Sequence, residues 1–300
     1  MTTTEERKRE LWSQKLQSLV SEKAEFAALP KPLVLSKIAL LEKKNPKLWR
    51  ECLKLYEKES SEKQFLKKQA IKEAVKFVRA ELRVVYSSFL SPKHAKKEKL
   101  LASCKTEDKV LELLTLHKSS KERFAVYEEL YERIFLWSGK TNNIVDIACG
   151  FNPLSFSLLR TIFGKKLKVF ACDMNKDDME FLQAAATKFS WNLKTKAVDV
   201  MSEECLTLPE VNDPDSLVFL FKALDSFEHV QRHWSKHLVS RLPAKKLVVS
   251  FALNSLGAHK KFETKNRGSW FVKYCEKNGW SCEPFVLGSE LYVLVKKNYV

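Results

Sequence analysis

The chain has 300 residues and a formal net charge of +16, with 53 Lys and Arg residues against 37 Asp and Glu. This length favours two domains, and the 45% share of hydrophobic residues indicates a folded protein. No apolar run reaches about 18 residues, so no membrane span is predicted. The first ten residues are polar and charged, which argues against a secretory signal, and we expect a cytoplasmic protein.

Cysteine and histidine usage predicts neither a metal site nor a disulfide framework. The seven Cys are scattered without a CxxC pair, which indicates a reducing compartment. His229, His233 and His237 have helical spacing, but no carboxylate or Cys completes a ligand set, and a solvated basic helix face is the preferred interpretation.

Residues 1–115 have helical periodicity and a high Lys content, and we expect helices over 4–26, 32–43, 46–58 and 61–82. In the last of these, Lys67, Lys68 and Lys72 lie between the apolar positions and predict a basic outer face. An all-helical domain of this charge favours nucleic acid as its partner. A solvated Lys-rich surface is the alternative.

After a linking helix expected over 119–138, strand-length apolar runs alternate with helices. The expected strands cover 143–148, 168–172, 193–198, 217–221 and 246–251, followed by a hairpin of about 280–287 and 290–297. Such alternation predicts parallel strands joined by right-handed crossovers. Residues 116–300 are therefore expected to form a Rossmann-like α/β domain with a seven-stranded sheet and one antiparallel strand.

The segment IVDIACGFNPLSFSLL, from Ile144 to Leu159, is the strongest motif. Asp146 lies near the end of a buried strand, Gly150 lies in the following turn, and an apolar helix begins after Pro153. The motif is neither GxGxxG nor a Walker loop, so a pyrophosphate cradle is poorly supported. A ligand with a carboxylate and an adenosine fits better.

Acidic residues end three consecutive strands of the expected sheet. Asp173 is placed to accept both ribose hydroxyls of such a ligand, and Asp199 to contact an adenine amine while Val200 packs against the ring. Each acid alone could instead cap local structure. The fourth strand ends at Phe221-Lys222, where the tip would face an acceptor, and the absence of GxSxG gives a hydrolase no support.

Three segments resemble the aminoglycoside-resistance methyltransferases of small-subunit ribosomal RNA, which form 7-methylguanosine in the decoding site. They are His117 to Phe124, Val145 to Leu154, and Val249-Ser-Phe with Ser255-Leu-Gly257 and the closing Gly288 to Lys297. The resemblance covers about residues 115–298 and implies a class I methyltransferase domain that depends on S-adenosylmethionine. Lys121, Phe124 and Ala258 depart from the family's usual pattern.

The resemblance also implies roles for individual residues. Arg123 would clamp the methionine carboxylate of the cofactor. The other residues implied at the cofactor are Asp146, Ala148, Gly150, Asp173, Met174, Asp199, Val200 and Phe221. The acceptor side would carry the catalytic residues Lys222, Phe251 and Ser255. We expect RNA contacts from His117 and Lys260, and also from Lys67, Lys68 and Lys72 on the basic face of the helical domain.

We therefore expect a monomeric methyltransferase of ribosomal RNA in the small subunit, acting at guanine N7 in the decoding region. Guanine N7 has a free lone pair at neutral pH, so the transfer needs alignment but no general base. A base in a helix would be flipped out and stacked on aromatic groups. The alternatives are methylation of another RNA or position, or a catalytically silent ribosome-binding factor.

Overall fold

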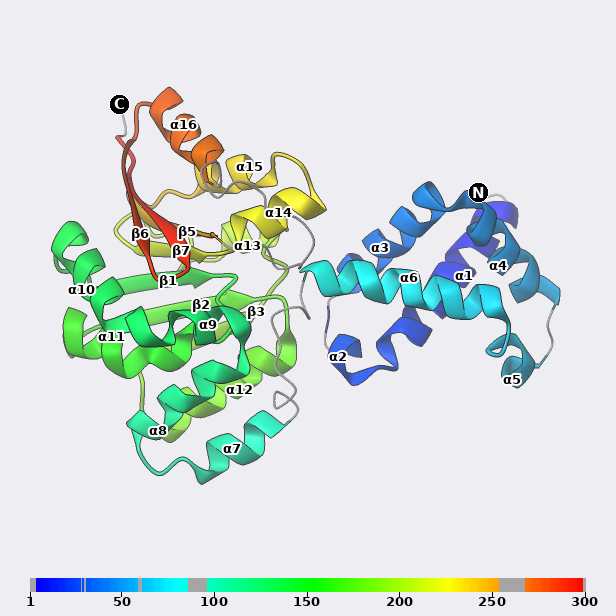
Figure 1. Ribbon diagram of the computed structural model, residues 1–300, viewed down its shortest axis with the longest axis horizontal. Coiled ribbons are helices and arrows are strands. Elements are labelled where there is room, and N and C mark those ends of the chain that lie inside the picture. The colour runs from blue at the N-terminus through cyan, green and yellow to red at the C-terminus, as the bar shows by residue number, and fades with distance from the viewer. Residues whose placement is uncertain are drawn as a thin grey trace. The chain divides into compact units, whose positions relative to one another are not determined.

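The computed structural model describes residues 4–27, 29, 31–58, 61–85, 96–253 and 268–298. The chain divides into two compact units, Met1–Ser88 and Phe89–Val300 (Figure 1). In the described ranges, no helix combines the length and the apolar character that crossing a bilayer requires.

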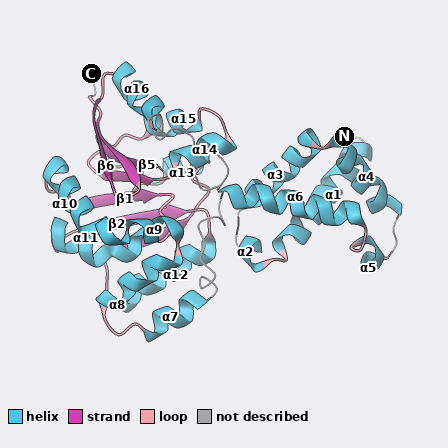
Figure 2. Ribbon diagram, in the orientation of Figure 1, coloured by secondary structure: helices cyan, strands magenta, loops and turns pink. Residues whose placement is uncertain are grey.

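The described part of the first unit is helical (Figure 2). Its helices are α1 (Thr4–Ser21), α2 (Ala24–Ala27), α3 (Lys31–Lys44), α4 (Pro46–Lys58), α5 (Glu62–Phe65) and α6 (Gln69–Val85). The single helix expected over 61–82 is therefore two helices. The chain turns at 66–68, and Phe65 packs edge-on against the buried Trp12 with ring centroids 5.9 Å apart. The helix expected over 4–26 is likewise divided.

The boundary between the units lies after Ser88, whereas the sequence interpretation put it near residue 115. Three short helices between these positions are α7 (Lys97–Ser103), α8 (Glu107–Leu111) and η3 (Glu112–Leu116). Leu101, Val110 and Leu114 on these helices are buried in the hydrophobic core of the second unit. Short amphipathic helices have the same periodicity in either unit, so the pattern could not assign them.

The second unit contains a seven-stranded sheet in the order β3-β2-β1-β4-β5-β7-β6. The strands are β1 (Asn143–Ile147), β2 (Lys168–Asp173), β3 (Leu193–Ala197), β4 (Leu217–Phe221), β5 (Lys246–Ala252), β6 (Ser281–Leu287) and β7 (Glu290–Lys296). β7 pairs antiparallel with both β5 and β6, and the other pairs are parallel. The predicted Rossmann-like sheet with a terminal hairpin is confirmed.

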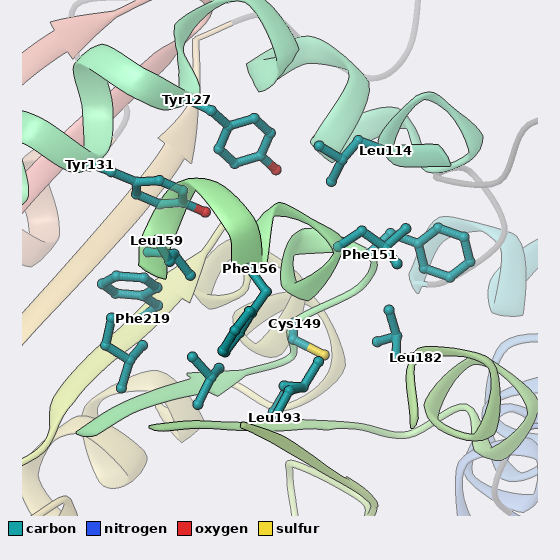
Figure 3. Packing of buried hydrophobic residues seen from close by; sticks show 14 of the residues in the cluster. Leu114, Tyr127, Tyr131, Cys149, Phe151, Phe156, Leu159, Leu182, Leu193 and Phe219 are labelled. Carbon is teal, nitrogen blue, oxygen red and sulfur yellow. The ribbon is translucent and has the colours of Figure 1, made fainter. Parts of the chain in front are cut away.

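Helices cover both faces of this sheet (Figure 1). On one face lie α9 (Lys118–Arg123), η4 (Phe124–Val126), α10 (Tyr127–Ser138), η5 (Asn152–Ser155), α11 (Phe156–Phe163) and α12 (Lys176–Lys188). On the other lie α13 (Glu203–Thr207), α14 (Leu224–Val230), α15 (Trp234–Arg241) and α16 (Ser269–Lys277). Figure 3 shows Tyr127 and Tyr131 of α10 above Phe219 of β4 and Phe156 of α11 in the first of these cores.

Strand order places the candidate site. β1 pairs with β2 on one side and with β4 on the other. The strand order therefore reverses at β1, with β2 and β3 on one side of it and β4 and β5 on the other. In open α/β sheets, ligands bind beyond the carboxyl ends of the strands at this switch point. All five residues of β4 are buried, so the strand ends at this point are held by the core.

Candidate functional site

The turn after β1 brings the backbone close to a neighbouring ring. Ala148 and Gly150 both have left-handed backbone conformations, with φ of +56° and +51°. A Cβ at Gly150 would lie 2.9 Å from Cε1 of His117, closer than a side chain tolerates. His117 is 8% exposed and its Nδ1 lies 2.9 Å from Ser119 Oγ. Because His117 is buried beneath this turn, the structure does not support the RNA contact expected for this residue.

Asp146 on β1 is a buried acid with an incomplete set of hydrogen bonds. Its Oδ2 accepts a hydrogen bond of 2.7 Å from Asn152 Nδ2, whereas its buried Oδ1 has no protein partner. Asp146 is 2% exposed, and burial raises the pKa of its carboxyl to about 7. A buried acceptor without a donor is costly, so this oxygen is suited to a ligand that carries a donor.

The acids that end β2 and β3 also lie at this edge. Asp173 accepts hydrogen bonds from the backbone N–H groups of Gly150 (2.9 Å) and Met174 (2.7 Å), which ties the end of β2 to the turn. Burial raises the pKa of Asp173 to about 6. Asp199 accepts from the N–H of Met201 at 2.9 Å, and Val200 beside it is buried.

Arg123 is buried at the centre of the site, with 2% of its surface exposed. Its Nε donates to Glu290 Oε1 at 2.9 Å and its Nη1 donates to Asn152 Oδ1 at 2.8 Å, while its guanidinium lies 4.9 Å from the centre of the Phe221 ring. Burial alone would lower the pKa of Arg123, but the Glu290 carboxylate together with Tyr127, Tyr292 and Tyr131 outweighs burial, and the pKa is raised.

Lys222 follows β4 with φ of +55°, which is unusual for a residue with a long side chain. Its Nζ lies 3.1 Å from Glu290 Oε1 and forms a second ion pair with Glu122. Ser250 of β5 donates from Oγ to Glu290 Oε2 at 2.6 Å and its Oγ accepts from the N–H of Lys222 at 3.0 Å. The Glu290 carboxylate at the start of β7 thus binds both Arg123 and Lys222, and it connects the ends of β4, β5 and β7.

Sequence reasoning missed Glu290, which lies in the expected hairpin and received no role there. A signal was available, because Glu290 shares one face of the expected strand with the apolar positions Tyr292 and Leu294. A carboxylate at an inward position of a strand needs a charged or hydrogen-bonding partner. Asn152, which bridges Arg123 and Asp146, was also missed.

Phe251 does not offer a ring face at this edge. Phe251 is 1% exposed and packs against Trp270 and Phe271 of α16, so it is a core residue and not a surface for an acceptor. Ser255 and Lys260 lie outside the described residues. The structure brings no group of three or more His, Cys, Asp or Glu side chains together for a metal ion in its described ranges.

Lys67, Lys68 and Lys72 are exposed in the first unit. Lys72 borders a groove of about 440 Å³ between α1 and α6. Its lining combines apolar side chains with basic residues of α6, and comprises Leu19, Glu22, Leu66, Ile71, Lys72, Val75, Lys76, Arg79 and Arg83. Arg79 donates to the carbonyls of Leu19 (2.7 Å) and Val20 (3.2 Å), which fixes the end of α1 as one wall.

Comparison with known proteins gives consistent matches. A family model described as "Ribosomal RNA methyltransferase (FmrO)" matches residues 70–295. A 16S rRNA (guanine(1405)-N(7))-methyltransferase of Serratia marcescens is 28% identical over 229 residues, covering 76% of this chain and 84% of that protein. Its counterpart from Micromonospora rosea is 24% identical over 237 residues, with the same coverage of 76% and 84%.

Two solved structures have the same fold over nearly the whole chain. The 16S rRNA methylase RmtB superposes with a TM-score of 0.66 at 23% identity, covering 95% of this chain and 98% of its own. The methyltransferase RmtF in complex with S-adenosyl-L-homocysteine gives a TM-score of 0.67 at 19% identity, with coverage of 95% and 98%.

Proposed function

The chain belongs to the FmrO family of ribosomal RNA methyltransferases, and from this premise we propose that it transfers a methyl group from S-adenosylmethionine to guanine N7 in 16S ribosomal RNA of the small subunit. The observation that carries the proposal is the placement of Arg123 and three strand-end acids around one switch point. The two curated relatives are named as enzymes of this specificity, which supports the choice of base and atom.

The residues at the switch point fit S-adenosylmethionine. The orphaned Oδ1 of Asp146 is an acceptor for an ammonium group, and the Arg123 guanidinium suits a carboxylate. Asp173 accepts from the backbone N–H groups of Gly150 and Met174 and is an acceptor suited to a ribose hydroxyl. The left-handed turn at Ala148 and Gly150 presents backbone in place of a side chain to this ligand.

Methyl transfer to guanine N7 requires the protein mainly to align the two reactants. S-adenosylmethionine supplies an electrophilic methyl group on a sulfonium, and guanine N7 offers a lone pair without deprotonation. The chain's task is to hold the base in line with the methyl group and exclude water. Glu290 serves this task indirectly, because it fixes Arg123 on the cofactor side and Lys222 at the tip of β4.

RNA binding by the first unit is part of the proposal. The groove between α1 and α6 carries the exposed Lys72 and Lys76 on α6, whereas Arg79 donates to the carbonyls of Leu19 and Val20 and Arg83 pairs with Glu25. Lys72 and Lys76 lie four residues apart, which is about 6 Å of helix, so both can contact phosphates of one strand. Of the three lysines predicted from sequence, Lys72 lines this groove.

The function is tested by incubating the protein and labelled S-adenosylmethionine with small ribosomal subunits, naked 16S ribosomal RNA and tRNA, followed by mapping of the modified base. We expect 7-methylguanosine in 16S ribosomal RNA of the small subunit. Label confined to tRNA, or a different methylated atom, would show another specificity on the same scaffold. Failure to bind S-adenosylhomocysteine by calorimetry would indicate a factor without turnover.

The groove is tested by the double charge reversal Lys72→Glu with Lys76→Glu. Because each phosphate contact contributes about one to the slope of log affinity against log salt, the slope for RNA should become less negative by about two. The matched control reverses the exposed Lys47 and Lys54 of α4, which changes net charge equally. Equal losses in the two variants would assign RNA attraction to overall charge and not to the groove.

A further inference from the structure

An acceptor base in this site needs an aromatic partner, and the one expected from the sequence is buried. Nucleobases removed from a helix are held by stacking on aromatic side chains. Phe251 is enclosed by α16 and cannot offer a ring face. We propose that Phe124 is the residue on which the acceptor base of ribosomal RNA stacks. This inference rests on the proposed function.

Phe124 differs in exposure from every other aromatic residue whose burial the structure describes. It is 45% exposed, whereas each of the other Phe, Tyr and Trp side chains in those ranges is buried or half-buried. A single exposed apolar residue is ordinary on a protein surface, so exposure alone does not indicate a function for Phe124. Its location relative to the site supplies the further evidence.

That location is fixed by the residues before it. Glu122 forms an ion pair with Lys222 at the tip of β4, and Arg123 donates to Glu290 at the start of β7. Phe124 follows directly, where α9 ends and the short η4 interrupts the helix expected over 119–138. Its backbone therefore lies beside the residues that reach β4 and β7 at the switch point.

The surroundings of Phe124 also suit a nucleotide. Lys118 and Lys121 on α9 are exposed within the two preceding turns and supply positive charge for the flanking phosphates. A ring face stacks on any base, so Phe124 would hold the base while other groups select it.

Steady-state methylation of small subunits tests the role with Phe124→Ala and Phe124→Trp. Loss of one stacked base lowers affinity by about 5- to 150-fold, so Phe124→Ala should lower kcat/KM for the subunit by that factor. Phe124→Trp should retain activity within about 3-fold, because a larger ring also stacks. The affinity for S-adenosylhomocysteine, measured by calorimetry, should be the same in all variants.

The matched control is Leu136→Ala. Leu136 is 82% exposed on α10 near Ser138, whose carbonyl accepts from Lys246 at the opposite, amino end of β5. Its removal tests loss of an exposed apolar side chain elsewhere in the same unit. Equal kcat/KM for Phe124→Ala and Leu136→Ala would overturn the inference, as would weakened S-adenosylhomocysteine binding in Phe124→Ala, which would place Phe124 at the cofactor.

A crosslinking measurement does not depend on turnover. With p-benzoylphenylalanine in place of Phe124, irradiation on small subunits should crosslink to the methylated nucleotide or its neighbours, and the same replacement of Leu136 should not. Crosslinks elsewhere in the subunit, or none, would overturn the stacking role. Absence of methyl transfer by the unaltered protein would instead refute the proposed function.

Discussion

Asp146→Asn should stabilise the unliganded protein, and the gain should depend on pH. The carboxyl is 2% exposed, and one of its oxygens lacks a donor, so its ionised form is poorly solvated in the folded chain. The asparagine has nearly the same shape and carries no charge. It can still accept a hydrogen bond from Asn152 through its amide oxygen.

The magnitude follows from the pKa of Asp146, which burial raises from an ordinary 3.8 to about 7. A shift of about three units corresponds to about 4 kcal/mol, at 1.36 kcal/mol per unit. Because the folded pKa is the higher one, folding is favoured below pH 4, where both states hold the proton. This advantage is lost as the pH rises to about 7. The stability gained by Asp146→Asn should therefore grow from near zero at pH 4 to about 4 kcal/mol at pH 8.

Urea denaturation of both proteins at several pH values measures this difference, in which the titration of all other groups largely cancels. The exposed Asp215→Asn controls for the loss of one negative charge. A difference in unfolding free energy that stays constant from pH 4 to 8 would refute the reasoning. Calorimetry should also show weaker binding of S-adenosylhomocysteine by Asp146→Asn, since the neutral side chain attracts an ammonium less strongly.

Gly150→Ala should destabilise the fold by about 2 kcal/mol or more, because the new Cβ combines a left-handed φ with a 2.9 Å approach to a buried imidazole. Gly279→Ala is the control, because Gly279 also has a left-handed φ, +68°, but a Cβ there would meet no atom within 4 Å. Equal losses of stability for the two variants in thermal denaturation would show that the contact with His117 costs nothing. Glu290→Gln should cost about 3–5 kcal/mol, since Arg123 and Lys222 lose their shared carboxylate in a buried place. A loss of less than 1 kcal/mol by urea denaturation would show that other groups compensate.

The sequence predicted the strands well because a strand in a parallel sheet is a short apolar run between turns. β4 was predicted with its observed bounds, 217–221, and the other strands differ from expectation by a residue or so. Helix breaks were predicted less well. The interruption at η4 and the turn at 66–68 occur inside continuous helical periodicity, where packing against distant residues decides the path.

By itself, the sequence determined the seven-stranded fold, the turn after β1 and the acids that follow successive strands, because period, turn chemistry and strand-end position are local properties. The tertiary structure alone decided which side chains form ion pairs and which are exposed to solvent. Glu290 lies 167 positions from Arg123, yet the two are hydrogen-bonded. Phe251 and Phe124 are both apolar in sequence, but α16 covers the first and leaves the second exposed. Burial of this kind depends on contacts between distant segments, and these form only when the sheet is assembled.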